Sequence, residues 1–394
     1  MSDFSGLGGL NKPQIDALRK ENLAVWCALN KFDVDHKPFT FKGRKFLKDI
    51  YKCNNPYITV RKCTQVGLTI WMVLKILHSL RFSEETGRQL AKKAGFYFPV
   101  FDSVAKFSKD RLRPMVYSIP EFKEALSGSI SIDLVQFGNS SLYLSYTGGV
   151  ASMDSTPMDV LCLDEVRLMA PATINQLEER LSGCAHPELY KISTAGYPND
   201  AIDKSFMLGT QKVWHTKCKC PDGIILSDHF PNCIGSRTNV KSGRPDYFYR
   251  CPKCGQEDLD PQDGGYVAHN PTSEYESFHI HQMLSATRSA KQVWERYITT
   301  DNPKEFYNAT LGKPYVDEEN VGVTDDELQA CVNPDISWNS DTKNTCMGVD
   351  QRSGNLHLVI AKMIDNKRRI IHVEIVDNQA EHTDLHHTRS SMSK

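Results

Sequence analysis

The stretch YITVRKCTQVGLTIWMVLKILHSLRF, residues 57–82, decides the fold of this chain. It opens with a strand-like run over 57–60, passes through a turn, and continues as an apolar segment over 68–82. That segment is longer than ten residues and apolar on most sides, which favours a buried helix over a strand. Strand, turn and buried helix is the order that a phosphate-binding loop requires. The sequence therefore predicts such a loop over 60–69.

The predicted loop lacks its usual lysine. Such loops end in Gly-Lys-Ser/Thr, because the lysine neutralises the outer phosphates while backbone N–H groups wrap them. Here Gly67 and Thr69 keep the pattern, but Leu68 occupies the lysine position. Lys62 lies at the opposite flank of the loop, preceded by Arg61. Because a curled loop brings both flanks near its ligand, we predict that Lys62 replaces the missing cation and that Thr69 binds Mg²⁺.

Two later strand ends carry the other groups that nucleotide hydrolysis needs. Asp164 and Glu165 follow one apolar run, and Ser193 and Thr194 follow the next. A carboxylate at a strand end can hold Mg²⁺, and its neighbour can orient and deprotonate the attacking water. Each of these ends, taken singly, is also an ordinary exit from a strand into a loop. Because all three strand ends occur in order with helices between them, they predict an ATPase.

The alternation of strands and helices predicts an α/β fold with a mostly parallel sheet and helices on both faces. Ligands of such a sheet bind at the carboxyl ends of its strands. With 47 basic and 48 acidic residues, composition alone does not indicate a nucleic-acid binder. Contacts with DNA would come from basic clusters such as 42–52 or 106–113, whose simpler interpretation is a solvated surface. The sequence shows no signal peptide and no apolar run near the roughly 20 residues that span a bilayer, so we expect a cytoplasmic protein.

Twelve cysteines in such a protein indicate metal binding or burial rather than a disulfide framework. The Cys-Pro-x-Cys-Gly turn at 251–255 shapes both thiolates toward one metal, and Cys218 and Cys220 supply a second pair. We therefore predict a structural Zn²⁺ site formed by Cys218, Cys220, Cys251 and Cys254. The one-residue spacer of the first pair is unusual, so Cys233 or His215 could replace one member. A ribbon that contacts DNA is the alternative role.

Two further features lie downstream. His279 and His281 have the spacing of one strand face, and a half-buried strand is favoured over metal ligation. Residues 346–379 contain three strand-like runs separated by turn residues, which predicts an antiparallel meander with Asp350 in its first strand.

These motifs together resemble the large terminase subunits of tailed bacteriophages, the DNA-packaging ATPases, and especially the branch with a shifted phosphate-loop lysine. The resemblance covers about 40–394, and the combination of motifs is specific although each motif alone is not. The segments that carry it are FLKDIYKCNNPYITV (46–60), RKCTQVGLT (61–69), VLCLDEV (160–166), KISTAG (191–196) and EFYNATLGKPY (305–315).

The resemblance implies a nucleotide site made by Arg61, Lys62, Gln65, Gly67, Thr69, Asp164 and Tyr51. In it, Lys62 takes the phosphate role, Asp164 holds Mg²⁺, and Glu165 acts as the catalytic base. Ser193 and Thr194 form the coupling motif. Tyr51 stacks on adenine, with Phe46 as the alternative.

The resemblance also implies a domain order. It comprises an N-terminal helical segment (1–40), a P-loop ATPase core (41–212), a zinc-binding insertion (213–270), a lid or linker subdomain (271–335) and the first strands of an RNase H-like nuclease domain (336–394). Asp350 would bind one of two catalytic metals there. Two-metal cleavage needs several converging carboxylates, and only some forty-four residues follow Asp350. We therefore expect the chain to end within that domain, and we do not expect nuclease activity from it alone.

The function implied is the ATP-driven motor of viral DNA packaging, which moves double-stranded DNA into the procapsid in the host cytoplasm. Its cofactors would be ATP, Mg²⁺ and Zn²⁺. Its partners would be double-stranded DNA, the small terminase subunit, the portal protein and further copies of itself in a ring. Two alternatives stay open: a helicase-like, DNA-stimulated ATPase, and a non-catalytic zinc-stapled remnant with a binding or regulatory role.

Overall fold

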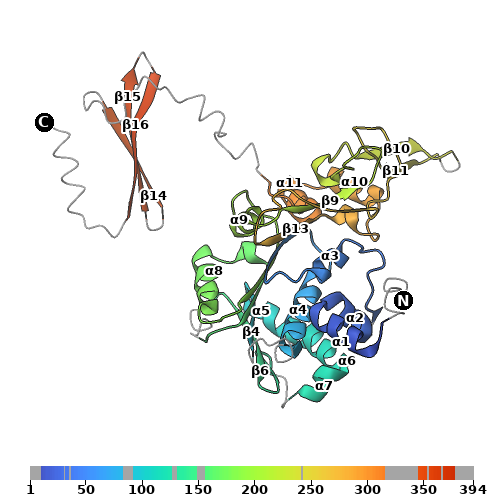
Figure 1. The fold of residues 1–394 in the computed structure, drawn as a ribbon. Helices are drawn as coiled ribbons and strands as arrows, with labels where there is room; N and C mark the ends of the chain where they lie inside the picture. The colour runs from blue at the N-terminus through green and yellow to red at the C-terminus, as the bar shows by residue number, and fades with distance from the viewer. Residues whose placement is uncertain are drawn as a thin grey trace. The chain divides into compact units, whose positions relative to one another are not determined.

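The computed structural model describes residues 10–30, 32–34, 37–82, 92–126, 131–148, 156–240, 243–315, 345–352, 355–364 and 367–377. The chain divides into two compact units, residues 1–317 and 318–394 (Figure 1).

The first unit is built on one large sheet. Its strands are β3 (Tyr57–Lys62), β4 (Lys93–Phe98), β5 (Leu134–Phe137), β6 (Ser140–Tyr146), β7 (Val160–Asp164), β8 (Glu188–Thr194), β9 (Lys212–Thr216), β12 (Gly264–Ala268) and β13 (Glu276–Ile280). Within the described residues these nine strands lie in the order β12-β9-β13-β3-β8-β7-β4-β6-β5. Neighbours from β9 to β6 pair in parallel, and only the edge strands β12 and β5 pair antiparallel. The predicted mostly parallel sheet is confirmed.

Helices flank this sheet in the first unit (Figure 1). The helices are α1 (Lys12–Glu21), α2 (Leu23–Asn30), α3 (Leu47–Lys52), α4 (Leu68–Phe82), α5 (Phe101–Phe107), α6 (Arg113–Ser118), α7 (Pro120–Ala125), α8 (Pro171–Glu178), α9 (Ala201–Leu208), α10 (Ala290–Ile298) and α11 (Pro303–Phe306). The α4 helix begins and ends where the apolar segment predicts, and most of its side chains are buried. Asn11 caps α1 as its position indicates, but the N-terminal helical stretch is broken at Asn22 into α1 and α2.

The side chains of strand β7 alternate between two apolar clusters, one on each face of the sheet. Val160 and Cys162 belong to the large apolar cluster on the face that α4 covers. Leu161 and Leu163 belong to a second cluster with α8 and α9 side chains, including Ile174 and Ile202. Because strand side chains point alternately to opposite faces, one strand can hold both layers. Helices therefore cover both faces, as the alternation predicted.

The cysteine-rich segment leaves the sheet and returns to it. The neighbours β9 and β12 pair antiparallel from Lys212 with Ala268 to Thr216 with Gly264, and residues 217–263 lie between them. That segment contains the hairpin of β10 (Ile234–Thr238) and β11 (Pro245–Tyr249). It has a small core of its own, which includes Leu226 and Tyr249 and is shared with α10 and α11. The sheet thus continues beyond residue 212, because β9, β12 and β13 all belong to it.

The second unit contains an antiparallel meander of β14 (Thr345–Arg352), β15 (Asn355–Ile364) and β16 (Lys367–Asp377). The predicted meander is confirmed. Asp350 lies in β14 and pairs with His357. That this sheet opens an RNase H-like domain stays a prediction.

Across the described ranges, none of the helices combines the length and apolar character that crossing a bilayer requires.

Candidate nucleotide site and cysteine cluster

Strand register brings the predicted site residues to one edge of the sheet. The neighbours β3 and β8 pair Lys62 with Thr194, and β8 and β7 pair Ile192 with Asp164. These parallel strands end together, so the groups at their carboxyl ends lie side by side. Three segments that are far apart in the sequence thereby form one polar site.

Lys62 forms an ion pair with Glu165. Its Nζ lies 2.8 Å from Oε1 of Glu165, and the lysine side chain is only 8% exposed. Burial works to raise the pKa of Glu165, but the charge and hydrogen bond of Lys62 outweigh it and leave the pKa below its usual value. Glu165 adopts a left-handed backbone conformation, with φ at 57°, which is uncommon outside glycine. The site therefore holds this carboxylate ionised in a strained position beside the loop.

The surroundings of the Asp164 carboxylate suit a bound metal cation. Its Oδ2 accepts a hydrogen bond of 2.9 Å from the Thr69 hydroxyl, while its buried Oδ1 has no partner among the described groups. Burial raises the pKa of Asp164 to about 6, and the nearby charge of Lys62 opposes that rise. A hydroxyl and a carboxylate with an unused buried oxygen are hard oxygen donors that suit Mg²⁺. Thr69 and Asp164 thus fit the predicted metal position.

Ser193 and Thr194, the residues predicted for coupling, contact an arginine that the sequence did not single out. The Arg167 Nε donates to the Thr194 hydroxyl at 2.7 Å, and its backbone N–H donates to the Ser193 hydroxyl at 3.2 Å. The Thr194 hydroxyl also lies 3.4 Å from Oε2 of Glu165. Arg167 follows Glu165 by two residues. This proximity was the only indication in the sequence that Arg167 belongs to the site. The two strand ends are therefore already hydrogen-bonded to each other.

The loop itself is curled between β3 and α4. Gln65 and Gly67 both have positive φ angles, of 62° and 83°. The α4 helix begins directly afterwards, so its first N–H groups have no partner within the helix and suit an anion. The Arg44 guanidinium lies beside Gly67, where a Cβ atom would be 3.3 Å from its Nη1. Arg44 belongs to the basic cluster noted in the sequence, but nothing there indicated that it reaches the loop.

Two residues predicted for the nucleotide site lie elsewhere in this structure. Arg61 pairs with Asp203 of α9 and stacks on Phe206, with its guanidinium carbon 4.0 Å from the ring centroid. Tyr51 is 1% exposed, and its ring packs edge-on against Phe41 with centroids 5.0 Å apart. Phe46, the alternative to Tyr51, is equally buried. None of the three side chains is open to a ligand here.

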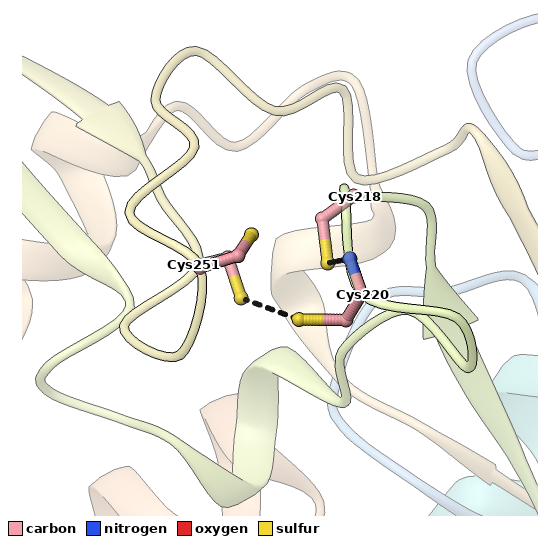
Figure 2. Close-up of side chains that lie close together, drawn as sticks. Cys218, Cys220 and Cys251 are labelled. Atoms are coloured by element: carbon pink, nitrogen blue, oxygen red, sulfur yellow. Dashed lines mark hydrogen bonds between the residues drawn. The ribbon is translucent and has the colours of Figure 1, made fainter.

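The four predicted cysteine ligands form one cluster. The sulfur atoms of Cys218, Cys220, Cys251 and Cys254 all lie within 4.8 Å of one another. Figure 2 shows three of them, with Sγ of Cys220 and Sγ of Cys251 3.8 Å apart. A tetrahedral site with Zn–S bonds of about 2.3 Å requires sulfur separations of about 3.8 Å. The donor set therefore fits Zn²⁺.

The turn at 251–255 has the shape that its sequence indicates. The Gly255 N–H donates to the Cys251 carbonyl at 2.9 Å, and Gly255 has a φ of 73°. The backbone N–H of Gln256 is the main cause that lowers the pKa of Cys254 to about 6. Cys233 is buried outside the cluster, and His215 is not among the metal-binding side chains that gather there in the described residues, so neither replaces a member of it.

His279 and His281 are buried at the end of β13. The Nε2 of His279 lies 2.8 Å from the Leu311 carbonyl. Within the described residues the two histidines join no group of three or more metal-binding side chains, and their burial lowers the pKa of both. The strand interpretation is confirmed for His279, whereas His281 directly follows the strand, and both side chains are fully rather than half buried.

Comparison with known proteins identifies the fold and the family. The family model of the phage terminase large subunit gpA, ATPase domain, matches residues 50–269, more than half of the chain. The chain belongs to the phage terminase large subunits. The matched range contains the loop, the Asp-Glu pair, the coupling residues and the cysteine cluster. That it belongs to the branch with a shifted lysine stays a prediction.

Two solved structures show what this terminase chain resembles in three dimensions. The crystal structure of the HK97 bacteriophage large terminase matches with a TM-score of 0.50 and 13% identity, over 91% of this chain and 67% of that one. The large terminase ATPase domain of Thermus phage P74-26 matches with a TM-score of 0.45 and 13% identity, over 72% of this chain and 96% of that one. The HK97 likeness confirms the fold alone. No curated protein matches the sequence.

The segment 305–315, quoted above for the terminase resemblance, lies directly against the loop. The Thr64 N–H donates to the Ala309 carbonyl at 2.9 Å, and Gly312 contacts the backbone of Lys62 and Cys63. The Tyr315 N–H donates to the Gly196 carbonyl at 3.2 Å. One short segment therefore touches both the loop and the end of the coupling strand.

Proposed function

We propose that this terminase chain hydrolyses ATP and uses the energy to drive double-stranded DNA into a viral procapsid. The observation that carries the proposal is the convergence of Lys62, Thr69, Asp164 and Glu165 at one sheet edge, with the coupling residues beside them. The family membership supports the same function.

The proposed roles follow from charge and position. Lys62 and the N–H groups of the first turn of α4 bind the phosphates. Thr69 and Asp164 hold Mg²⁺, which supplies charge neutralisation of the phosphates when bound. Glu165 accepts the proton of the attacking water, for which its lowered pKa keeps it ionised. The lysine that pairs with Glu165 in this state must turn to the phosphates when a nucleotide binds.

Coupling is proposed to run through the hydroxyls of Ser193 and Thr194. They contact Arg167 and Glu165, so a change at the terminal phosphate alters their hydrogen bonds first. The strand end then passes this change to the segment after Gly196. Movement of that segment would advance DNA through contacts with its backbone rather than its bases.

The remaining parts of the proposal concern the whole terminase chain. The cysteine cluster holds Zn²⁺ in a structural role. The chain works in the host cytoplasm as a ring of copies, together with the small terminase subunit and the portal protein. A nuclease domain that the meander begins, with Asp350 as a metal ligand, would cut concatemers.

Measurement of ATP hydrolysis with and without DNA tests the central claim. We expect Lys62→Ala and Glu165→Ala each to lower kcat by about 100-fold or more, since each removes a group that acts in the transition state. Lys291→Ala, which removes an exposed lysine on α10, is the matched control and should leave kcat unchanged.

The same assay separates the alternatives. Full activity of Lys62→Ala would refute the displaced lysine. Absence of hydrolysis by the unmodified chain, with DNA and the small subunit supplied, would favour a non-catalytic remnant. DNA-stimulated hydrolysis that neither the small subunit nor procapsids increase further would favour a helicase-like ATPase.

A further inference from the structure

A buried asparagine lies between the phosphate loop and β8, the strand that ends in the coupling residues. Asn308 is only 6% exposed, and it has no role in the nucleotide site described above. It belongs to a wide π-helical turn, Tyr307–Leu311, that directly follows α11. Such turns are rare and occur frequently at functional sites. Because a buried amide needs hydrogen-bond partners, the partners of Asn308 show what this turn holds together.

The side-chain amide of Asn308 joins two backbone segments. In the orientation in which both of its polar atoms find partners, its Nδ2 donates to the Gly196 carbonyl at 3.0 Å and to the Lys313 carbonyl at 2.8 Å. Gly196 follows the coupling residue Thr194 by two positions. Its carbonyl accepts a second hydrogen bond, from the Tyr315 N–H at 3.2 Å. The chain just beyond β8 is therefore fastened to the segment 305–315 by two donors on one oxygen.

The next residue of the same turn holds the phosphate loop. The Ala309 carbonyl accepts hydrogen bonds from the Thr64 N–H at 2.9 Å and from the Thr64 hydroxyl at 3.2 Å. Asn308 and Ala309 are adjacent in the chain, so consecutive residues hold the end of the coupling strand and the loop. A displacement of either one is thereby passed to the other through a single peptide unit.

We propose that Asn308 is a positioning residue for ATP hydrolysis, whose amide fixes the end of the coupling strand relative to the phosphate loop. The inference rests on the proposed function, since it concerns the spacing of Thr194 and Glu165, whose Oε2 lies 3.4 Å from the Thr194 hydroxyl. Asn308 acts through these two residues and not on the nucleotide. Its loss should therefore slow the chemical step and spare nucleotide binding.

Separate measurements of hydrolysis and binding on the full chain test this role. A steady-state assay gives kcat, and calorimetry gives the affinity for a non-hydrolysable ATP analogue with Mg²⁺. Asn308→Leu removes both donors at similar size, and Asn308→Asp places a carboxylate against two carbonyl oxygens. We expect kcat to fall about tenfold in the first variant and further in the second, with analogue affinity within about twofold in both.

Asn270→Leu is the matched control. The Asn270 amide also donates to a glycine carbonyl, that of Gly209 at 3.1 Å, but it lies near the start of β9 and not at the loop. This variant should change neither kcat nor analogue affinity.

The outcomes are distinguishable. Intact analogue binding shows that a variant still folds its loop. An equal loss of kcat and of analogue affinity in both Asn308 variants would indicate a purely structural role and overturn the proposal, as would an unchanged kcat in Asn308→Asp. Failure of the unmodified chain to bind the analogue and to hydrolyse ATP would refute the proposed function itself, and this inference with it.

Discussion

Neighbouring carboxylates at the end of β7 have opposite pKa shifts. Burial raises the pKa of Asp164 to about 6, whereas the bond to Lys62 holds the pKa of Glu165 below its usual value. The difference arises because one side chain reaches the lysine and the other keeps an oxygen buried without a partner. Such separation of two titrating groups is typical of sites that assign them different roles.

The shift at Asp164 predicts a stability that depends on pH. Its pKa in the folded chain, about 6, exceeds the value of 3.8 expected when unfolded. The folded state therefore binds a proton more tightly, and its stability falls as pH rises through that interval. Above pH 6 the loss of folding stability reaches its full value, about 3 kcal/mol at most.

Substitution Asp164→Asn should remove this cost. In Mg²⁺-free buffer we expect the variant to have a higher free energy of unfolding than the unmodified chain at pH 8, with the difference disappearing near pH 4. Urea unfolding at several pH values measures it. A constant difference across that range would show that Asp164 does not titrate as the structure indicates.

Motif spacing in the sequence was sufficient to predict that Lys62, Thr69, Asp164 and Glu165 lie together, because local strand and loop order carries that information. It was insufficient for Arg167 and Arg44, whose positions depend on how distant segments pack. It was also insufficient for the burial of Tyr51, since an aromatic ring near a loop can face the ligand or the core. Only the folded structure shows whether such a ring faces the ligand or the core.

At the level of elements, the contacts of segment 305–315 show why residue 312 is a glycine. Gly312 has a φ of 64°, and a Cβ atom there would lie 2.5 Å from the Ile280 carbonyl oxygen and 3.0 Å from the Cys63 nitrogen. Glycine is thus required both by its backbone conformation and by the approach of the phosphate loop.

Substitution Gly312→Ala should therefore displace the loop. Gly138→Ala is a matched control, because Gly138 also has a positive φ, of 55°, but its Cβ would meet nothing within 4 Å. We expect both to lose about 1 kcal/mol of stability from backbone strain, and Gly312→Ala to lose more because its Cβ collides with backbone atoms. Only Gly312→Ala should lower kcat/KM for ATP, by about tenfold. Equal effects on hydrolysis would contradict the role of this contact.

Elements with strong local patterns were predicted well, and those that depend on distant pairing were not. The apolar run of α4 and the antiparallel meander of β14, β15 and β16 were visible in the sequence. The strands β9 and β12 were not, since each is short and they pair with each other across the long cysteine-rich segment.

At the scale of the whole molecule, we expect the fold of segment 217–263 to depend on a metal ion bound by the cysteine cluster. Metal analysis should find about one zinc per chain, lost in Cys251→Ser, because three thiolates hold zinc less tightly than four. Cys233→Ser is the control, since Cys233 is buried outside the cluster and should keep the metal.

Proteolysis gives a second readout of the same change. Loss of zinc should expose 217–263 to cleavage while the main sheet stays resistant, because β9 and β12 connect that segment to the sheet. Retention of zinc by Cys251→Ser, or its loss from Cys233→Ser, would contradict the ligand set.

The ion pair between Lys62 and Glu165 has a consequence for a machine built from several such chains. With the roles proposed above, a subunit without nucleotide would have its catalytic base paired with its own lysine and would not hydrolyse. Incoming phosphates would compete for that lysine, so nucleotide binding would also release the base. Each copy would then begin its cycle only after it has bound a nucleotide.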